Sequence, residues 1–167
     1  MGIIRKIVHF LAIICYILIF AYALICVPMI FGYRPLVVLT GSMEPTIKTG
    51  SVLYYKKVPQ EELKVGDPIT FKINNQVVSH RINNIINGEY ETKGDANDSP
   101  DPIKTKYQNI LGKDAKITIP YAGYYVWFIN QHLYLIIVVI IILISEFLLG
   151  NRRTLDIDKN LKEEEVL

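Results

Sequence analysis

The stretch "LYLIIVVIIILIS", residues 133–145, decides the architecture, because it is the densest part of a segment that carries no charge from residue 117 to residue 145. A second uncharged segment covers residues 7–33. A helix rises about 1.5 Å per residue, so roughly 20 residues cross a hydrocarbon layer about 30 Å thick. Both segments are long enough to span a membrane. We therefore expect two transmembrane helices.

The first segment also has features of a secretory signal peptide. A basic pair, Arg5-Lys6, precedes an apolar run that contains "AYA", residues 21–23, with a small-x-small site ending at Ala23. The run continues beyond this site, however, whereas the apolar part of a signal peptide is only about 7–15 residues long. We expect a retained anchor, which Pro28 kinks or ends near its outer side.

A pair of basic residues lies at the terminal end of each apolar segment. Arg5-Lys6 precedes the first segment and Arg152-Arg153 follows the second. Cytoplasmic loops carry an excess of Lys and Arg, so both termini are expected in the cytoplasm. The expected organisation is a cytoplasmic N-terminus (1–6), a first transmembrane helix (7–31), an extracytoplasmic domain (32–122), a second transmembrane helix (124–149) and a cytoplasmic tail (150–167).

The middle region, residues 32–122, alternates apolar and polar residues with the period of a β-strand. Its charges nearly balance, and the chain as a whole carries only +2, so no basic patch indicates nucleic acid as a partner. Asn75 and Gly88 have the composition of hairpin turns. The expected fold is mainly β, a small β-rich domain between two transmembrane helices. Strand candidates are residues 35–39, 51–55, 68–73, 76–85, 89–93 and 115–119, with a short helical turn at 60–63.

Residues that bind metals or form disulfides are scarce in this domain. Cys15 and Cys26 both lie in the first apolar segment, so the polar region has no disulfide framework. The loop "TKGDANDSPD", residues 92–101, resembles the start of a calcium loop, but Pro100 stands where an EF-hand has Gly and Lys106 where it has Glu. We expect no metal and no cofactor.

Ser42, in "TGSMEPTIKTG" (residues 40–50), is the candidate nucleophile. A nucleophilic serine needs a base within reach and a third group that orients the base. His80 is the only histidine of the middle region, since His9 and His132 fall in the apolar segments. Ser79 is not a rival, because adjacent strand residues point to opposite faces. Taken alone, each feature is typical of a turn or of a structural histidine.

Taken together, these motifs resemble the signal peptidase I family, in its endoplasmic-reticulum and archaeal branch that also occurs in some Gram-positive bacteria. The resemblance rests on "GSMEP", "VGDPITF" (65–71), "SHRI" and "KGDANDSPD" in this order. It implies that Ser42 attacks the scissile carbonyl and that His80 acts as general base. Asp101 and Asp95 match the family's acids, and which of them contacts His80 stays open. Ala96 stands where the family usually has Asn.

The implied activity is a membrane-bound serine endopeptidase that removes signal peptides from secretory preproteins after small-x-small sites outside the cytoplasm. The backbone around Gly41 and Met43, with the Thr40 hydroxyl, is expected to form the oxyanion hole. The expected partners are preproteins and the lipid bilayer, with accessory subunits left open. The Ile-, Asn- and Lys-rich composition favours a prokaryotic plasma membrane over the endoplasmic reticulum.

Two other hypotheses remain at this stage. One is a serine/lysine enzyme that uses Lys48, Lys56 or Lys57 as its base. The other is a non-enzymatic, membrane-anchored β domain that assists the assembly of a surface structure. Whether the substrates are many preproteins or a dedicated few is also open, as is the oligomeric state.

Overall fold

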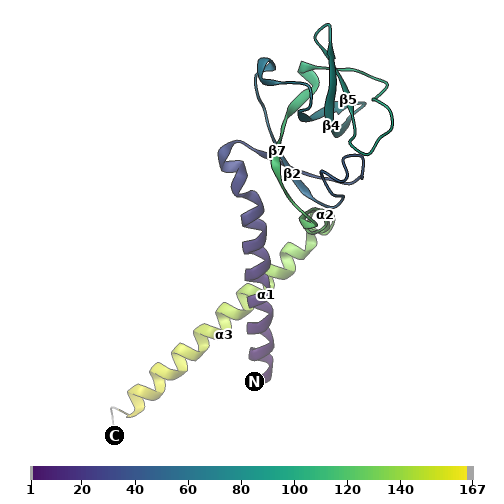
Figure 1. Ribbon diagram of the computed structural model, residues 1–167. Coiled ribbons are helices and arrows are strands. Elements are labelled where there is room, and N and C mark those ends of the chain that lie inside the picture. Colours follow the sequence, from purple (N-terminus) through teal and green to yellow (C-terminus); the bar gives the residue numbers. More distant parts are fainter. Residues whose placement is uncertain (1, 165–167) are drawn as a thin grey trace. The chain divides into compact units, whose positions relative to one another are not determined.

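The computed structural model describes residues 2–164, with side chains as far as residue 151. The chain forms two compact units. One unit, residues 25–128, contains every strand of the described chain (Figure 1), and the other is made of the helical segments that precede and follow it in the sequence. This arrangement confirms the predicted fold class, a mainly β domain between two apolar helices.

The N-terminal helix α1 spans Gly2–Cys26 and passes into a short 3₁₀ helix, η1, at Val27–Phe31. Pro28 stands in the first turn of η1, so of the two outcomes expected at this proline, a kink or an end, the α-helix ends, at Cys26. Gly32 then closes η1 in the left-handed region, with φ 82°. The stretch Gly2–Phe31 is long and apolar enough to cross a membrane.

The second apolar segment contains two helices, α2 (Ala122–Gln131) and α3 (Tyr134–Glu164), where the sequence suggested one at 124–149. The interruption follows Asn130 and Gln131, two polar residues in an otherwise apolar segment, and Asn also has a low helix propensity. Here the N–H of Leu135 donates to the carbonyl of His132 over only three residues, at 2.8 Å. The part of α3 that can cross a membrane is Tyr134–Asn151.

The β unit is one antiparallel sheet of seven strands in the order β1-β2-β7-β3-β4-β5-β6. The short strand β6 and the first half of β7 are absent from the sequence prediction. The strands are β1 (Arg34–Val37), β2 (Val52–Lys56), β3 (Pro68–Ile73), β4 (Gln76–Ile86), β5 (Glu89–Lys93), β6 (Thr105–Lys106) and β7 (Ile110–Ile119), with 3₁₀ turns η2 (Gln60–Glu62) and η3 (Tyr107–Asn109).

Two tight hairpins fix the register of the central strands. Asn74 and Asn75 join β3 to β4, and Asn87 and Gly88 join β4 to β5, all four with positive φ. Such turns match the right-handed twist of the strands they connect. The first hairpin brings His80 opposite Ile69 in the ladder. The predicted hairpin turns at Asn75 and Gly88 are confirmed.

Two apolar clusters of the β unit position the site. The larger cluster holds the β3–β4 hairpin, and the smaller one places the segment after β1 against β2. Buried members of the first are Leu63, Ile69, Phe71, Ile82, Tyr90 and Ile110; those of the second are Met43, Ile47 and Leu53.

The strand edges without a neighbour in the described sheet include one on β1 and one on β4. β1 is an end strand that pairs only with β2. β4 pairs with β3 along its first half, but β5 joins it only from Arg81 onward. The first half of β4 therefore has an unpaired edge that ends at His80. Unpaired edges can accept an additional strand.

A buried carboxyl lies on the face of the sheet opposite to His80. Asp114, only 5% exposed, accepts a hydrogen bond from Thr70 Oγ1 at 2.6 Å and another from the Ser79 hydroxyl. These contacts join β7, β3 and β4. Burial raises the pKa of Asp114 to about 6, although the two hydrogen bonds act in the opposite direction.

We expect Asp114 to make the β unit less stable as pH rises from about 4 to about 6. In this range the folded state retains a proton that the unfolded chain has already released, because an unperturbed Asp titrates near 3.9. The free energy of unfolding falls by about 3 kcal/mol at most over this pH range. Hydrogen exchange of β3, β4 and β7 in the full chain measures it, and Asp114→Asn should remove this part of the pH dependence. An identical pH slope in both proteins would contradict the assignment.

Candidate active site

Ser42 lies in a turn that is anchored on both sides. Met43 next to it is 2% exposed and packs in the smaller apolar cluster. The Glu44 N–H donates to the Gly41 carbonyl at 3.0 Å, and the Glu44 carboxylate accepts the N–H and hydroxyl of Thr49 at 3.1 and 2.8 Å. These bonds lower the pKa of Glu44. The turn thus holds the Ser42 side chain at a fixed, partly exposed position.

His80 reaches Ser42 from strand β4. Its Nε2 lies 3.1 Å from Ser42 Oγ, and its Nδ1 lies 2.6 Å from Asp101 Oδ2. A carboxylate can only accept, so Nδ1 carries the proton and donates it to Asp101. In the neutral ring, Nε2 is then the acceptor for the Ser42 hydroxyl. The imidazole is 8% exposed and packs edge-on against the Phe71 ring.

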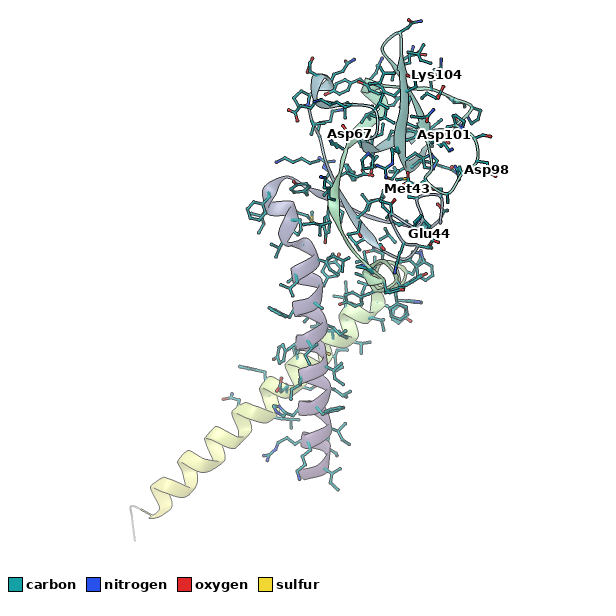
Figure 2. The ribbon with its side chains drawn as sticks, in the orientation of Figure 1. Met43, Glu44, Asp67, Asp98, Asp101 and Lys104 are labelled. Atoms are coloured by element: carbon teal, nitrogen blue, oxygen red, sulfur yellow. The ribbon has the colours of Figure 1, made fainter. Side chains whose placement is uncertain are left out.

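Asp101 is itself held by the end of strand β5. The fully buried Thr92 donates its hydroxyl to Asp101 Oδ2 at 2.6 Å, and the Asp101 N–H donates to the Thr92 carbonyl at 2.8 Å. The question that spacing left open is answered here, because the acid in contact with His80 is Asp101. Asp98, in the same loop, is exposed and lies on its outer side (Figure 2).

Asp95 forms an ion pair with Arg81 instead of contacting His80. Its two oxygens accept Arg81 Nε at 2.8 Å and Nη2 at 2.6 Å, which is the bidentate geometry of strong charge-assisted pairs. Arg81 Nη1 also donates to the Gly66 carbonyl at 2.8 Å. The Arg81 guanidinium holds the pKa of Asp95 below its usual value. Asp95 therefore fixes the loop that precedes Asp101.

The same loop contacts the backbone of Ser42. The Ala96 N–H donates to the Ser42 carbonyl at 2.9 Å. A Cβ at Gly94 would lie 2.5 Å from that carbonyl oxygen, so a side chain at this position would displace Ser42. Ala96 makes this contact through its backbone.

The three residues expected to form an oxyanion hole lie next to Ser42, at the edge of a groove. In the described residues 2–164, no backbone carbonyl accepts the N–H of Ser42 or of Met43. Thr40 is exposed, and Gly41 is partly exposed. The groove has a volume of about 500 Å³ and lies between the segment 36–43 and the first half of β4, 76–79, with Ile47 and Leu53 as its floor.

The lysines of the alternative hypothesis have other contacts. Lys57 Nζ donates to the Ile110 carbonyl and lies 4.3 Å from the centre of the Tyr107 ring. Lys56 Nζ lies over the Tyr33 ring at 5.4 Å. No contact between Lys48 and Ser42 is among those of the described chain, where Ser42 Oγ has His80 as its side-chain partner. Among the described residues, no group of three His, Cys, Asp or Glu side chains is placed to hold a metal ion.

Sequence reasoning missed three residues that build this site: Arg81, Thr92 and Glu44. Arg81 directly follows His80, and a basic residue beside a candidate base could have suggested a partner for the second acid. Thr92 and Glu44 gave no such signal, because their roles depend on contacts that only the folded chain forms.

Comparison with known proteins matches these residues to one family. A family model described as "Signal peptidase, peptidase S26" matches residues 7–105. The chain is similar to "Signal peptidase I W" of Bacillus subtilis (strain 168), with 37% identity over 99 residues that cover 56% of this chain and 52% of the relative. It is also similar to "Signal peptidase complex catalytic subunit SEC11" of Candida dubliniensis, with 30% identity over 111 residues that cover 59% of this chain and 66% of the relative.

The matches extend over about half to two thirds of the length of these two relatives. The family match includes the first apolar helix, the Ser42 turn, the His80 strand and the loop with both acids. It covers more than half of the chain. The chain therefore belongs to the signal peptidase family, peptidase S26.

Proposed function

We propose that this chain is a membrane-bound serine endopeptidase that removes signal peptides from secretory preproteins. The observation that carries the proposal is the continuous chain of contacts from Ser42 Oγ through His80 to Asp101 and Thr92. A hydroxyl is a poor nucleophile at its free pKa and needs such a base. Membership of the signal peptidase family supports the same reaction.

In the proposed reaction, Ser42 Oγ attacks the scissile carbonyl while His80 Nε2 takes its proton. Asp101 accepts the hydrogen bond of Nδ1–H, which fixes the tautomer and stabilises the imidazolium that forms. His80 then gives the proton to the leaving amine, and the acyl-enzyme is hydrolysed by water activated by the same imidazole. The N–H groups of Ser42 and Met43, with Thr40, would stabilise the oxyanion, at about 3–4 kcal/mol for one donor.

The groove next to Ser42 suggests how the substrate binds. It is bordered by residues 36–43, which include the end of edge strand β1, and by the first half of β4, whose outer edge has no neighbour in the described sheet. An extended peptide in this groove could pair with either edge as an added strand. Its floor of Leu53, Ile47 and Met43 is apolar, which suits small apolar side chains before the cut. This would be the basis of small-x-small recognition.

Membrane attachment would bring the substrate to the site. A preprotein presents its cleavage site just beyond a lipid-embedded apolar segment, and tethering both molecules to one bilayer raises their effective concentration. Cytoplasmic loops carry an excess of Lys and Arg, so the basic pairs Arg5-Lys6 and Arg152-Arg153 support the proposal that both termini are cytoplasmic and the β unit lies outside. One relative is named as a subunit of a signal peptidase complex, so accessory subunits are part of the proposal.

We expect Ser42→Ala and His80→Ala each to lower the cleavage rate of a preprotein with an "AxA" site by at least about 10³-fold, because each removes one half of the activated nucleophile. The measurement uses the full chain in liposomes. Ser99→Ala, the same change at an exposed residue of the acid loop, is the matched control and should cleave normally. Cleavage by purified Ser42→Ala at the normal rate would reject the proposal.

Substitutions of the two acids, Asp101 and Asp95, should differ in their effect on kcat. Asp101→Asn is expected to lower kcat by about 10³–10⁴-fold, because the amide no longer holds the required tautomer of His80. Asp95→Asn removes the charge that pairs with Arg81 and should cost much less, about tenfold. Asp98→Asn, at an exposed acid in the same loop, is the control. A larger loss of kcat with Asp95→Asn than with Asp101→Asn would contradict the assignment of Asp101 as the acid that orients His80.

The contact between the acid loop and Ser42 should also be testable. Gly94→Ala is expected to lower kcat, since its Cβ would lie 2.5 Å from the Ser42 carbonyl oxygen and would move the nucleophile. Ala96→Ser keeps the N–H that donates to Ser42 and should leave kcat nearly unchanged. Normal turnover by Gly94→Ala would mean that this contact does not position Ser42.

A further inference from the structure

A polar cluster joins the two apolar helices, far along the chain from the Ser42 site. Both carboxylate oxygens of Glu146, on α3, have a partner on α1. His9 Nδ1 lies 2.8 Å from Oε1, and the Tyr16 hydroxyl donates to Oε2 at 3.1 Å. All three residues fall inside the stretches that can cross a membrane. Ionisable side chains in such segments are costly and are commonly functional.

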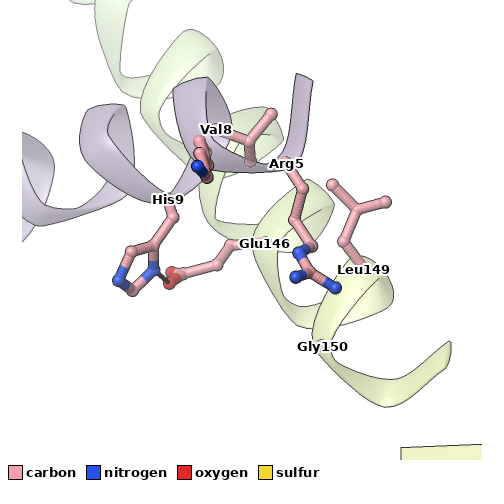
Figure 3. A pocket seen from close by; sticks show the side chains of 7 residues that line it. Arg5, Val8, His9, Glu146, Leu149 and Gly150 are labelled. Carbon is pink, nitrogen blue, oxygen red and sulfur yellow. Dashed lines mark hydrogen bonds and ion pairs between the residues drawn. The ribbon is translucent and has the colours of Figure 1, made fainter. Parts of the chain in front are cut away.

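A pocket of about 300 Å³ opens beside this cluster (Figure 3). Arg5 and His9 reach it from the same face of α1, four residues apart, and Lys6 lies next to Arg5. Glu146 and Gly150 reach it from α3, also four residues apart. Apolar walls complete it, made by Val8 and Leu149.

The charges around the pocket favour an anion. Arg5 and Lys6 are exposed and have no carboxylate partner among the ion pairs of the described side chains. Among the described residues that line the pocket, Glu146 is the only carboxylate, and its oxygens are already engaged by His9 and Tyr16. Within the described part of the chain, this leaves two exposed cations at the pocket, and a guanidinium matches the geometry of a phosphate.

We propose that this pocket binds the phosphate headgroup of an acidic phospholipid. Arg5 and Lys6 hold the phosphate, and the acyl chains lie along the apolar surfaces of α1 and α3. A lipid fits better than free phosphate because the pocket has apolar walls and lies near the ends of two stretches long enough to span a bilayer. Basic pockets between transmembrane helices bind such headgroups. The proposal does not depend on the peptidase reaction.

Native mass spectrometry of the full chain, released from phosphatidylcholine micelles and titrated with phosphatidylglycerol, tests the proposal. We expect one phosphatidylglycerol to be retained with at least about tenfold preference over added phosphatidylcholine. Arg5→Gln and Lys6→Gln should each weaken retention roughly fivefold, as expected for one basic residue near a headgroup. Arg34→Gln removes an equivalent charge from exposed β1 and is the matched control, expected to bind as the wild type does.

The variant Gly150→Leu tests the role of the pocket separately from the role of the Arg5 and Lys6 charges. A Cβ at Gly150 meets no atom within 4 Å, so the larger side chain can be accommodated and should occupy the pocket while Arg5 and Lys6 remain. It should abolish the preference for phosphatidylglycerol. Equal retention of both lipids by the wild type, or unchanged retention in all three variants, would overturn the proposal. Displacement of the lipid by millimolar inorganic phosphate would show a site for free anions and would overturn it as well.

Discussion

The hydrogen bond from the Ala96 N–H to the Ser42 carbonyl, 2.9 Å long, is the contact on which the rest of the site depends. It joins the turn that carries the serine to the loop that carries both acids. Gly94 allows the close approach, and the Arg81–Asp95 pair holds the loop in place. Asp101 can then reach His80 from one side while Ser42 meets it from the other. Backbone contacts are suited to this purpose, because they leave every side chain of the site free for its own partner.

The sheet supplies the second requirement, which is an open path to the serine. Because β5 joins β4 only from Arg81 onward, the residues before His80 have an unpaired edge that faces a groove rather than another strand. The smaller apolar cluster lines this groove and also anchors the Ser42 turn. The same packing therefore shapes the proposed substrate site and fixes the nucleophile, so that core changes at Met43 or Leu53 would affect both.

Much of this structure could be predicted from the sequence. The uncharged stretches predicted both apolar helices, Pro28 predicted the end of α1, and Asn75 and Gly88 predicted the hairpins that set the register. The short strand β6 and the first half of β7 could not be predicted, because their local signals are weak and they form by pairing with β5 and β3, which are distant in the sequence. The break between α2 and α3 had only the weak local signal of two polar residues, Asn130 and Gln131. Order and spacing indicated Ser42 and His80. They could not distinguish Asp101 from Asp95, since that choice depends on where Thr92 and Arg81 place the two carboxylates.

The central claim is that Ser42 forms a covalent acyl-enzyme with the help of His80. It is tested most directly by trapping that intermediate: the full chain is mixed with a preprotein, quenched in acid within the first turnover, digested and mapped by mass spectrometry. The account predicts that the mass of the acyl fragment is added to the peptide that contains Ser42 and that His80→Ala shows no such addition. An adduct at another residue, or cleavage that proceeds without any adduct at Ser42 on the same time scale, would contradict it.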